Sequence, residues 1–85
     1  MAKVERAVVS LRLSDHREVD VDVPLFTPWS ELKEAILNIL RELYPAEFMR
    51  VEQITLIVYG TPIREEDTFG SRGVLEGAIL DVRIL

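Results

Sequence analysis

Hydrophobic residues recur at steps of three and four between residues 28 and 44, which is the spacing of one face of an α-helix. Thr27 is expected to cap this helix through its hydroxyl, and Pro28 suits the first helical position. Pro45 predicts the end of the helix. A lone helix of this length frays in water, so its apolar face must pack against other elements. The residues predicted on that face are Trp29, Leu32, Ile36, Ile39, Leu40 and Leu43.

Two segments before this helix, residues 4–13 and 17–23, alternate hydrophobic and polar side chains. This alternation predicts two strands of a sheet with one buried face and one wet face. A three-residue connection over residues 14–16 keeps the two patterns in phase, and we expect Asp15 or His16 to adopt the left-handed conformation that such a loop needs. The predicted register pairs Leu11 with Val19, Val9 with Val21, and Arg12 with Glu18.

The second half of the chain contains three further strand candidates. Residues 53–59 form a β-branched and aromatic run, Ile63 begins a very short edge strand, and residues 79–85 alternate again. Residues 46–53 show no convincing period and are interpreted as a loop, with a helical turn as the alternative left open. In the run 53–59, the side chains expected to meet the helix are Ile54, Leu56 and Val58, which leaves Thr55, Ile57 and Tyr59 on the opposite face.

The order hairpin, helix, strand, short strand, strand favours a two-layer α+β architecture. At 85 residues and 48% hydrophobic composition, the chain is expected to be a single domain over residues 1–85. No run approaches the about 18 apolar residues of a membrane span, and Glu5 interrupts any signal-peptide core, so we expect a cytoplasmic protein without direct membrane insertion. The chain has no cysteine, and its net charge of -5 opposes nucleic-acid binding.

Three segments in the last third of the chain resemble ubiquitin-like proteins. They are Tyr59–Ile63, Asp67–Phe69 and Gly73–Leu80. The resemblance implies a ubiquitin-like β-grasp fold, with a mixed sheet of four to five strands wrapped around one central helix. Within that superfamily the chain is most similar to the YukD/EsaB-like proteins associated with bacterial type VII secretion, through residues 20–24, Pro28 and residues 75–80.

Ubiquitin and the sulfur carriers act through a flexible tail that ends in Gly-Gly, whereas this sequence ends in a predicted strand at Leu85. We therefore expect a ubiquitin-like adaptor that is not conjugated and that binds a protein partner non-covalently, as an accessory of a type VII secretion system. Two alternatives stay open. One is a non-catalytic subunit of a multicomponent enzyme such as a di-iron monooxygenase, and the other is a carrier with a processed C-terminus. The oligomeric state is not predicted.

The candidate protein-binding surface is the face of the sheet that points away from the helix. An exposed aliphatic and aromatic cluster rimmed by charge is typical of interaction surfaces, although scattered exposed apolar residues are also ordinary. Ile57 matches the exposed aliphatic centre of the recognition patch of ubiquitin. Trp29 is a second candidate, either as a core side chain or as a protruding anchor, and the helical pattern favours the core. The predicted binding residues are Val8, Ile57, Tyr59, Arg83 and Arg6.

No catalytic, cofactor-binding or metal-binding residue is predicted. His16 beside Asp15 is formally half of an acid/base pair, but a turn residue is the better interpretation. Glu65, Glu66 and Asp67 could hold a hard cation, although contiguous carboxylates without further spaced ligands indicate a solvated loop. The glycines of the closing stretch, Gly70, Gly73 and Gly77, do not open a helix after a strand and are attributed to loop geometry.

Overall fold

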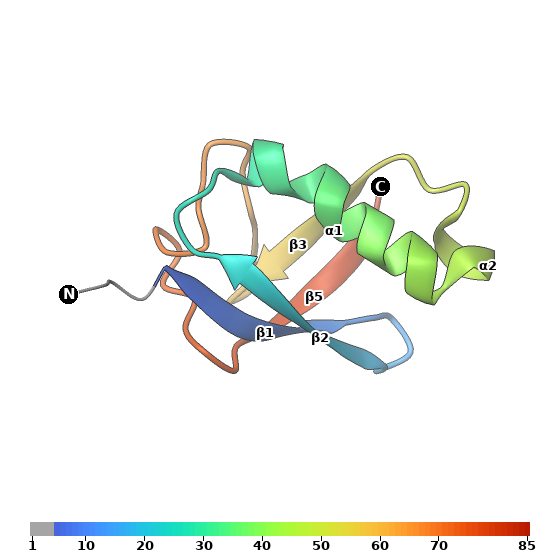
Figure 1. Cartoon of the computed structure of the whole chain (residues 1–85), viewed down its shortest axis with the longest axis horizontal. Helices are drawn as coiled ribbons and strands as arrows, with labels where there is room; N and C mark the ends of the chain where they lie inside the picture. The colour runs from blue at the N-terminus through green and yellow to red at the C-terminus, as the bar shows by residue number, and fades with distance from the viewer. Residues whose placement is uncertain (1–4) are drawn as a thin grey trace.

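The computed structural model describes residues 5–85; Val4, the expected start of the first strand, lies outside the described residues. One long helix crosses a twisted sheet, and the last strand runs through the middle of that sheet (Figure 1). The elements are β1 (Arg6–Arg12), β2 (Glu18–Pro24), α1 (Trp29–Leu43), α2 (Pro45–Phe48), β3 (Ile54–Val58), β4 (Thr61–Pro62) and β5 (Ile79–Ile84).

The sheet has five strands in the order β2-β1-β5-β3-β4. The pair β1–β5 is parallel and the other pairs are antiparallel, so the sheet is mixed, as predicted. Alternate side chains of β1, β3 and β5 are buried on the side of α1, and this apolar layer forms the core with the helix. Neither of the two helices within residues 5–85 is long and apolar enough to cross a membrane.

The register of the first hairpin is confirmed. Leu11 lies opposite Val19 and Arg12 opposite Glu18. His16 adopts the left-handed conformation, with φ of 70°. Strict alternation of side chains along each strand, together with the three-residue connection, was sufficient to fix this register.

The predicted cap of the long helix is wrong. The N-cap residue is Pro28, which was expected one place further on, at the first helical position, and no side chain caps the helix. The Thr27 hydroxyl therefore does not have this role. Instead, the amide of Trp29 donates to the carbonyl of Asp67 at 2.8 Å, and the amide of Ser30 donates to the carbonyl of Glu65 at 3.1 Å. A loop distant in sequence therefore satisfies the first orphan amides of α1.

The buried face of α1 is rotated relative to the predicted face. Trp29, Ile36 and Leu40 are buried as predicted, but Leu37 is buried too, and Ile39 and Leu43 are exposed. Leu32, the sixth predicted residue, is half-buried. Leu37 faces the start of β3, with which it lines a shallow hollow. The apolar stripe of α1 is wider than the surface that the sheet covers. Tertiary packing alone decides which edge of the stripe is buried.

The segment after α1 contains the helical turn that the sequence left open within the predicted loop. Pro45 ends α1 as predicted and then begins the single turn of α2, whose Phe48 is buried in the core. The Arg17 guanidinium lies over the ring of Tyr44 at 4.4 Å and also pairs with Glu47, so the first hairpin is tied to this turn. The expectation that Ile63 begins the short edge strand is also wrong, because β4 ends at Pro62 and Ile63 is buried.

Gly70 is required by close packing. Its amide donates to the carbonyl of Leu25 at 2.7 Å, and a Cβ at this position would lie 2.9 Å from the same oxygen. This contact fixes the closing loop against the segment that leads into α1. The interpretation of this glycine as a loop requirement therefore has a specific steric cause.

Candidate protein-binding face of the sheet

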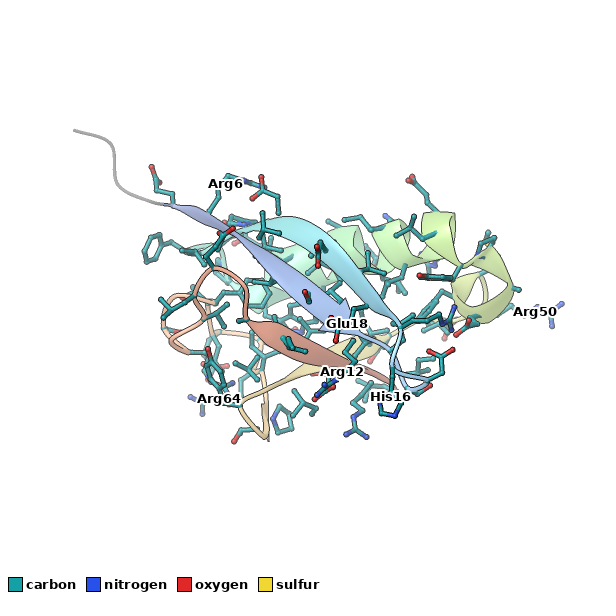
Figure 2. The ribbon with its side chains drawn as sticks, turned by 90° about the horizontal axis from the view of Figure 1, so that it is seen from below. Arg6, Arg12, His16, Glu18, Arg50 and Arg64 are labelled. Atoms are coloured by element: carbon teal, nitrogen blue, oxygen red, sulfur yellow. The ribbon has the colours of Figure 1, made fainter. Side chains whose placement is uncertain are left out.

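Strand alternation determines which side chains point away from α1. In β1, Ala7, Val9 and Leu11 are buried, so Arg6 and Val8 lie on the outer face. The same parity places Ile57 of β3 and Arg83 of β5 on that face. Figure 2 shows the sheet from below, with Arg6 and Arg12 near opposite ends of β1.

Three aliphatic side chains form a diagonal row across the outer face, which we call the outer apolar cluster: Val8, Ile79 and Ile57. Ile79 lies in register with Ser10, which is two residues after Val8 in β1. Asp81, two residues after Ile79 in β5, pairs with Ile57. Ile79 was not among the predicted binding residues. Its outward position follows from the same parity, because Leu80 and Val82 are buried. Val8 and Ile79 are exposed, whereas Ile57 is half-buried rather than exposed.

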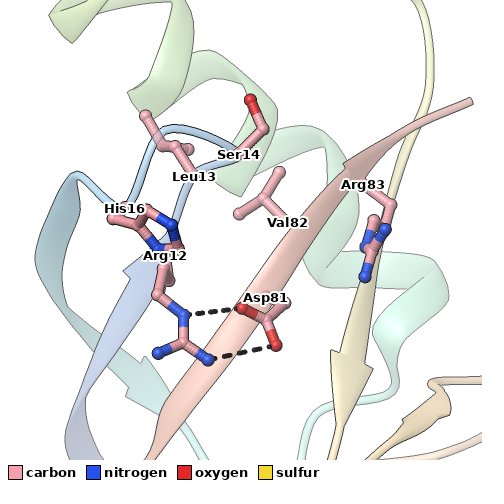
Figure 3. Close-up of a pocket in the computed structure, with 7 residues that line it drawn as sticks. All are labelled: Arg12, Leu13, Ser14, His16, Asp81, Val82 and Arg83. Carbon is pink, nitrogen blue, oxygen red and sulfur yellow. Dashed lines mark hydrogen bonds and ion pairs between the residues drawn. The ribbon is translucent and has the colours of Figure 1, made fainter.

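An ion pair lies beside this cluster. Arg12 Nε donates to Asp81 Oδ1 at 2.8 Å, across the parallel ladder between β1 and β5 (Figure 3). The hydrogen bond from Arg12 holds the pKa of Asp81 below its ordinary value, and the charges of Arg83 and His16 act in the same direction. The central strand thus presents a fixed carboxylate at the edge of the outer apolar cluster.

The structure does not gather all five predicted binding residues into one site. Arg6 pairs with Asp22 at 3.2 Å beyond one end of the cluster, while Arg83 lies opposite Thr55 beyond the other end. By the ladder register, these two arginines are roughly 25 Å apart along the strand direction. Tyr59 leaves the ladder with φ of 48°, and its hydroxyl donates to the carbonyl of Gly73 at 3.3 Å. Its side chain is 64% exposed, so the ring lies at the rim.

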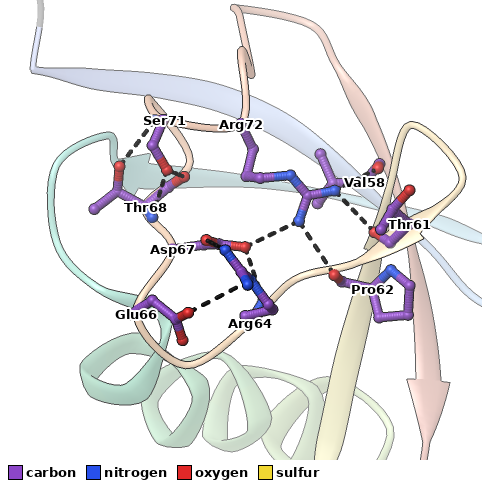
Figure 4. A network of polar contacts seen from close by, with 9 residues as sticks. All are labelled: Val58, Thr61, Pro62, Arg64, Glu66, Asp67, Thr68, Ser71 and Arg72. Atoms are coloured by element: carbon purple, nitrogen blue, oxygen red, sulfur yellow. Dashed lines mark hydrogen bonds and ion pairs between the residues drawn. The ribbon is translucent and has the colours of Figure 1, made fainter.

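A network of polar contacts centres on Arg72, which was not among the residues predicted from the sequence to have a role. Its guanidinium donates to the carbonyls of Val58, Thr61 and Pro62 at 3.0 to 3.2 Å, and to Asp67 Oδ2 at 3.2 Å (Figure 4). These contacts join the β3–β4 turn to the loop that caps α1. No isolated sequence pattern marks such an arginine, because its acceptors are main-chain groups brought together only by folding.

Asp67 is part of the same network, so the interpretation of residues 65–67 as a solvated loop is wrong for this residue. Asp67 is buried, and its Oδ2 accepts the amide of Arg64 at 3.0 Å. This backbone hydrogen bond is the main cause that lowers the pKa of Asp67, and the bond from Arg72 adds to it. Residues 5–85 contain no group of three or more His, Cys, Asp or Glu placed to hold a metal ion.

The lowered pKa values of Asp67 and Asp81 predict a loss of stability in acid. A carboxyl whose folded pKa lies below its unfolded value of about 3.9 stabilises the fold above that value. This contribution is lost as the pH falls through the folded pKa. The melting temperature should therefore fall below about pH 4, and the double variant Asp67→Asn, Asp81→Asn should lose less on acidification. Equal acid dependence of both proteins would contradict the assignment.

Replacement of Arg72 by alanine should destabilise the fold by about 2 to 3 kcal/mol, because several main-chain carbonyls and Asp67 lose a charged donor together. Arg72→Lys should recover only part of this loss, since an ammonium cannot reproduce the planar fork. The measurement is chemical unfolding followed by the fluorescence of the single tryptophan. Full rescue by lysine would show that charge alone matters at this position.

The chain matches no protein-family model, and no match is found among curated proteins. Among solved structures, it is similar to the EccD5 ubiquitin-like domain from Mycobacterium xenopi, with 20% identity over 94% of both chains and a TM-score of 0.79. It is also similar to the ubiquitin-like domain of the type VII secretion protein ECCD1 from Mycobacterium tuberculosis, with 20% identity, coverage of 98% of this chain and 99% of that chain, and a TM-score of 0.74.

A third similar structure is a chain of the ESX-5 inner membrane complex. The match has 18% identity and a TM-score of 0.76, and it covers 95% of this chain but 21% of that chain. At these identities the likeness concerns the fold. The mixed five-stranded sheet and the helix that crosses it have the ubiquitin-like β-grasp architecture, which confirms the fold predicted from the sequence.

Proposed function

We propose that this chain is a non-conjugated, ubiquitin-like adaptor that docks on a protein partner through the outer apolar cluster. The observation that carries the proposal is the row Val8, Ile79 and Ile57, flanked by the ion pair of Arg12 and Asp81. An aliphatic centre with a charged rim can exclude water at the centre while polar groups remain solvated at the edge. None of the proposed contacts requires a covalent step.

The setting we propose is the cytoplasmic side of a bacterial type VII secretion system, where the chain acts as an accessory component. The support is the similarity in fold to the ubiquitin-like domains of EccD5 and ECCD1 and to a chain of the ESX-5 inner membrane complex. The YukD/EsaB-like resemblance of the sequence agrees with this setting. The proposed partner is therefore a protein of that machinery.

Purification of the tagged chain from its native cell, followed by mass spectrometry, tests this setting. Recovery of a membrane ATPase or other type VII components is the expected result. Recovery of hydroxylase subunits instead would favour the alternative of a non-catalytic subunit of a di-iron monooxygenase. A thiocarboxylate or isopeptide adduct on the chain would contradict the non-conjugated role.

Ile57→Ala and Tyr59→Ala should each weaken partner recovery while the fold is retained. Tyr59 is exposed, so its truncation should cost about 0.5 kcal/mol of stability or less. Ile57 is half-buried, so we expect a larger cost, about 1 kcal/mol. Partner recovery and melting temperature are measured on the same preparations, with Arg64→Ala as an exposed control. Parallel loss of folding and binding would place these side chains in the core instead.

A further inference from the structure

Strand β1 ends before its neighbour β5 does. The last register pair of the parallel ladder is Arg12 with Asp81, and the amide of Leu13 then donates to the carbonyl of Arg17 on the other side, at 2.8 Å. Strand β5 continues to Ile84. Within residues 5–85, the edge of β5 from Val82 to Ile84 thus extends beyond the end of β1.

The backbone groups on this part of β5 point into the space that β1 vacates. Alternate residues of a strand direct their backbone groups to opposite neighbours. The amide of Leu85 donates to Gln53 on the β3 side, whereas the carbonyl of Ala78 accepts from Ser10 of β1. By this alternation, the carbonyl of Val82 and the amide of Ile84 face the β1 side. The Ile84 side chain is 55% exposed, so this end of the strand is accessible.

Two hollows flank this backbone edge. We call the edge and the two hollows together the β5 notch. The outer hollow, of about 360 Å³, is shown in Figure 3, and the inner hollow measures about 270 Å³. Both are lined by Leu13 and Ser14 on one side and by Val82 and Arg83 on the other. They therefore lie on the two faces of one gap, where successive side chains of an added strand would point.

The two hollows differ in chemistry. The outer one is lined by Arg12, Arg83 and His16, with Asp81 as its one carboxylate. Arg12 is engaged with Asp81, whereas no carboxylate within residues 5–85 forms an ion pair with Arg83. This lining is net positive although the chain carries a net charge of -5. The inner hollow is mainly apolar, with Leu13, Phe48, Val82 and Ile84 in its lining. The lining also includes Ser14, Arg83 and Glu47, and Glu47 is paired with Arg17.

We propose that the β5 notch binds an extended segment of a partner protein in which acidic and aliphatic residues alternate. The segment pairs with the Val82 carbonyl and the Ile84 amide, as in β-strand addition to a sheet edge. An acidic side chain enters the outer hollow beside Arg83, and the next, aliphatic side chain enters the inner hollow against Phe48. This inference rests on the proposed protein-docking role. It uses the edge of β5, which shares the ion pair of Arg12 and Asp81 with the surface of the outer apolar cluster but none of the three aliphatic side chains of that cluster.

The test uses the described chain and the peptide Ac-TEVEVET-NH2 as a probe. Titration followed by amide NMR should give saturable shifts at Ser14, Val82 and Ile84, and hydrogen exchange of the Ile84 amide should slow on binding. The lysine peptide Ac-TKVKVKT-NH2 should bind at least about tenfold more weakly, because its charges oppose those of the outer hollow. The acidic peptide with every backbone nitrogen methylated has no N–H donor for the Val82 carbonyl, and its N-methyl groups keep its backbone away from the strand edge. It should therefore not pair as a strand and should not protect the Ile84 amide.

Charge reversal identifies the residue that selects the ligand. Arg83→Glu should weaken binding of the acidic peptide roughly fivefold or more and strengthen binding of the lysine peptide. Arg6→Glu makes the same charge change at the opposite end of the sheet and should leave both affinities unchanged. Ile57→Ala should also leave them unchanged, which separates failure of the notch from failure of the outer apolar cluster.

Three results obtained with the unmethylated peptides would overturn the proposal. They are the absence of saturable shifts at millimolar peptide, equal binding of the acidic and lysine peptides, and binding that leaves hydrogen exchange of the Ile84 amide unaltered. Binding of the methylated peptide with full affinity would equally exclude strand addition. Melting curves of each variant, followed by the fluorescence of Trp29, show that the folded protein is being compared.

Discussion

Trp29→Ala is expected to destabilise the fold by about 3 to 5 kcal/mol, which is a large fraction of the total stability of a domain of this size. The side chain is 2% exposed and packs edge-on against Phe69, with ring centroids 6.4 Å apart. It begins α1 at the point where the backbone amide bonds the carbonyl of Asp67. Its truncation therefore leaves a cavity where the helix, the capping loop and the core meet.

Circular dichroism should show a fall in melting temperature of more than about 10 °C for this variant. Trp29→Phe is the matched control, because a smaller aromatic ring retains part of the contact with Phe69 and should lose less stability. A melting temperature of Trp29→Ala within a few degrees of the unaltered chain would show that the indole is a surface anchor. That was the alternative left open by the sequence.

Leu56→Ala should cost about 2 to 5 kcal/mol. Leu56 is 0% exposed at the centre of β3, lies in register with Val82 of β5, and accepts the amide of Ile63 through its carbonyl at 2.9 Å. The substitution removes buried methyl groups but keeps the ladder, so the expected loss arises from the lost burial of these groups and from the cavity that they leave. Chemical unfolding followed by the fluorescence of Trp29 measures it.

The neighbouring variant Ile57→Ala is the control for this prediction. It truncates a side chain on the same strand that points to the opposite face, so it should cost clearly less stability than Leu56→Ala. A reversal of this order would mean that the two faces of the sheet are assigned the wrong way round. The outer apolar cluster would then lose its basis.

Local patterns predicted those parts of the fold that depend on neighbours in sequence. The hairpin register followed from parity, and the left-handed residue was one of two candidates because few side chains tolerate that conformation. The extent of α1 also followed to within one residue, since Pro28 precedes the helix and Pro45 follows it. In each case the deciding interaction lies within a short span of the chain.

Predictions failed where distant segments decide the outcome. Thr27 is of a residue type that caps helices, but the carbonyls of Glu65 and Asp67 accept hydrogen bonds from the first amides of α1 instead. Ile39 and Leu43 fitted the apolar stripe, but the sheet covers the edge of that stripe that contains Leu37. Burial of Asp67 could not be read from a run of carboxylates, because it depends on Arg72 and on an amide of the same loop.

The candidate site was predictable in part. Parity correctly placed Val8 and Ile57 on the outer face and, applied to β5, would also have found Ile79. The wide separation of Arg6 from Arg83 required the parallel register between β1 and β5, which no local pattern contains. The β5 notch depends on the same register, because it exists only where β5 extends beyond the end of β1.

The most direct test of the docking role is a photo-cross-linking measurement in the native cell. A diazirine-bearing aliphatic amino acid is placed at position 79, at the centre of the outer apolar cluster, or as a control at position 31, which is exposed on α1. We expect a covalent adduct with a type VII secretion component from position 79 and none from position 31. Equal adducts from both positions, or no adduct from position 79 with the folded protein, would contradict it.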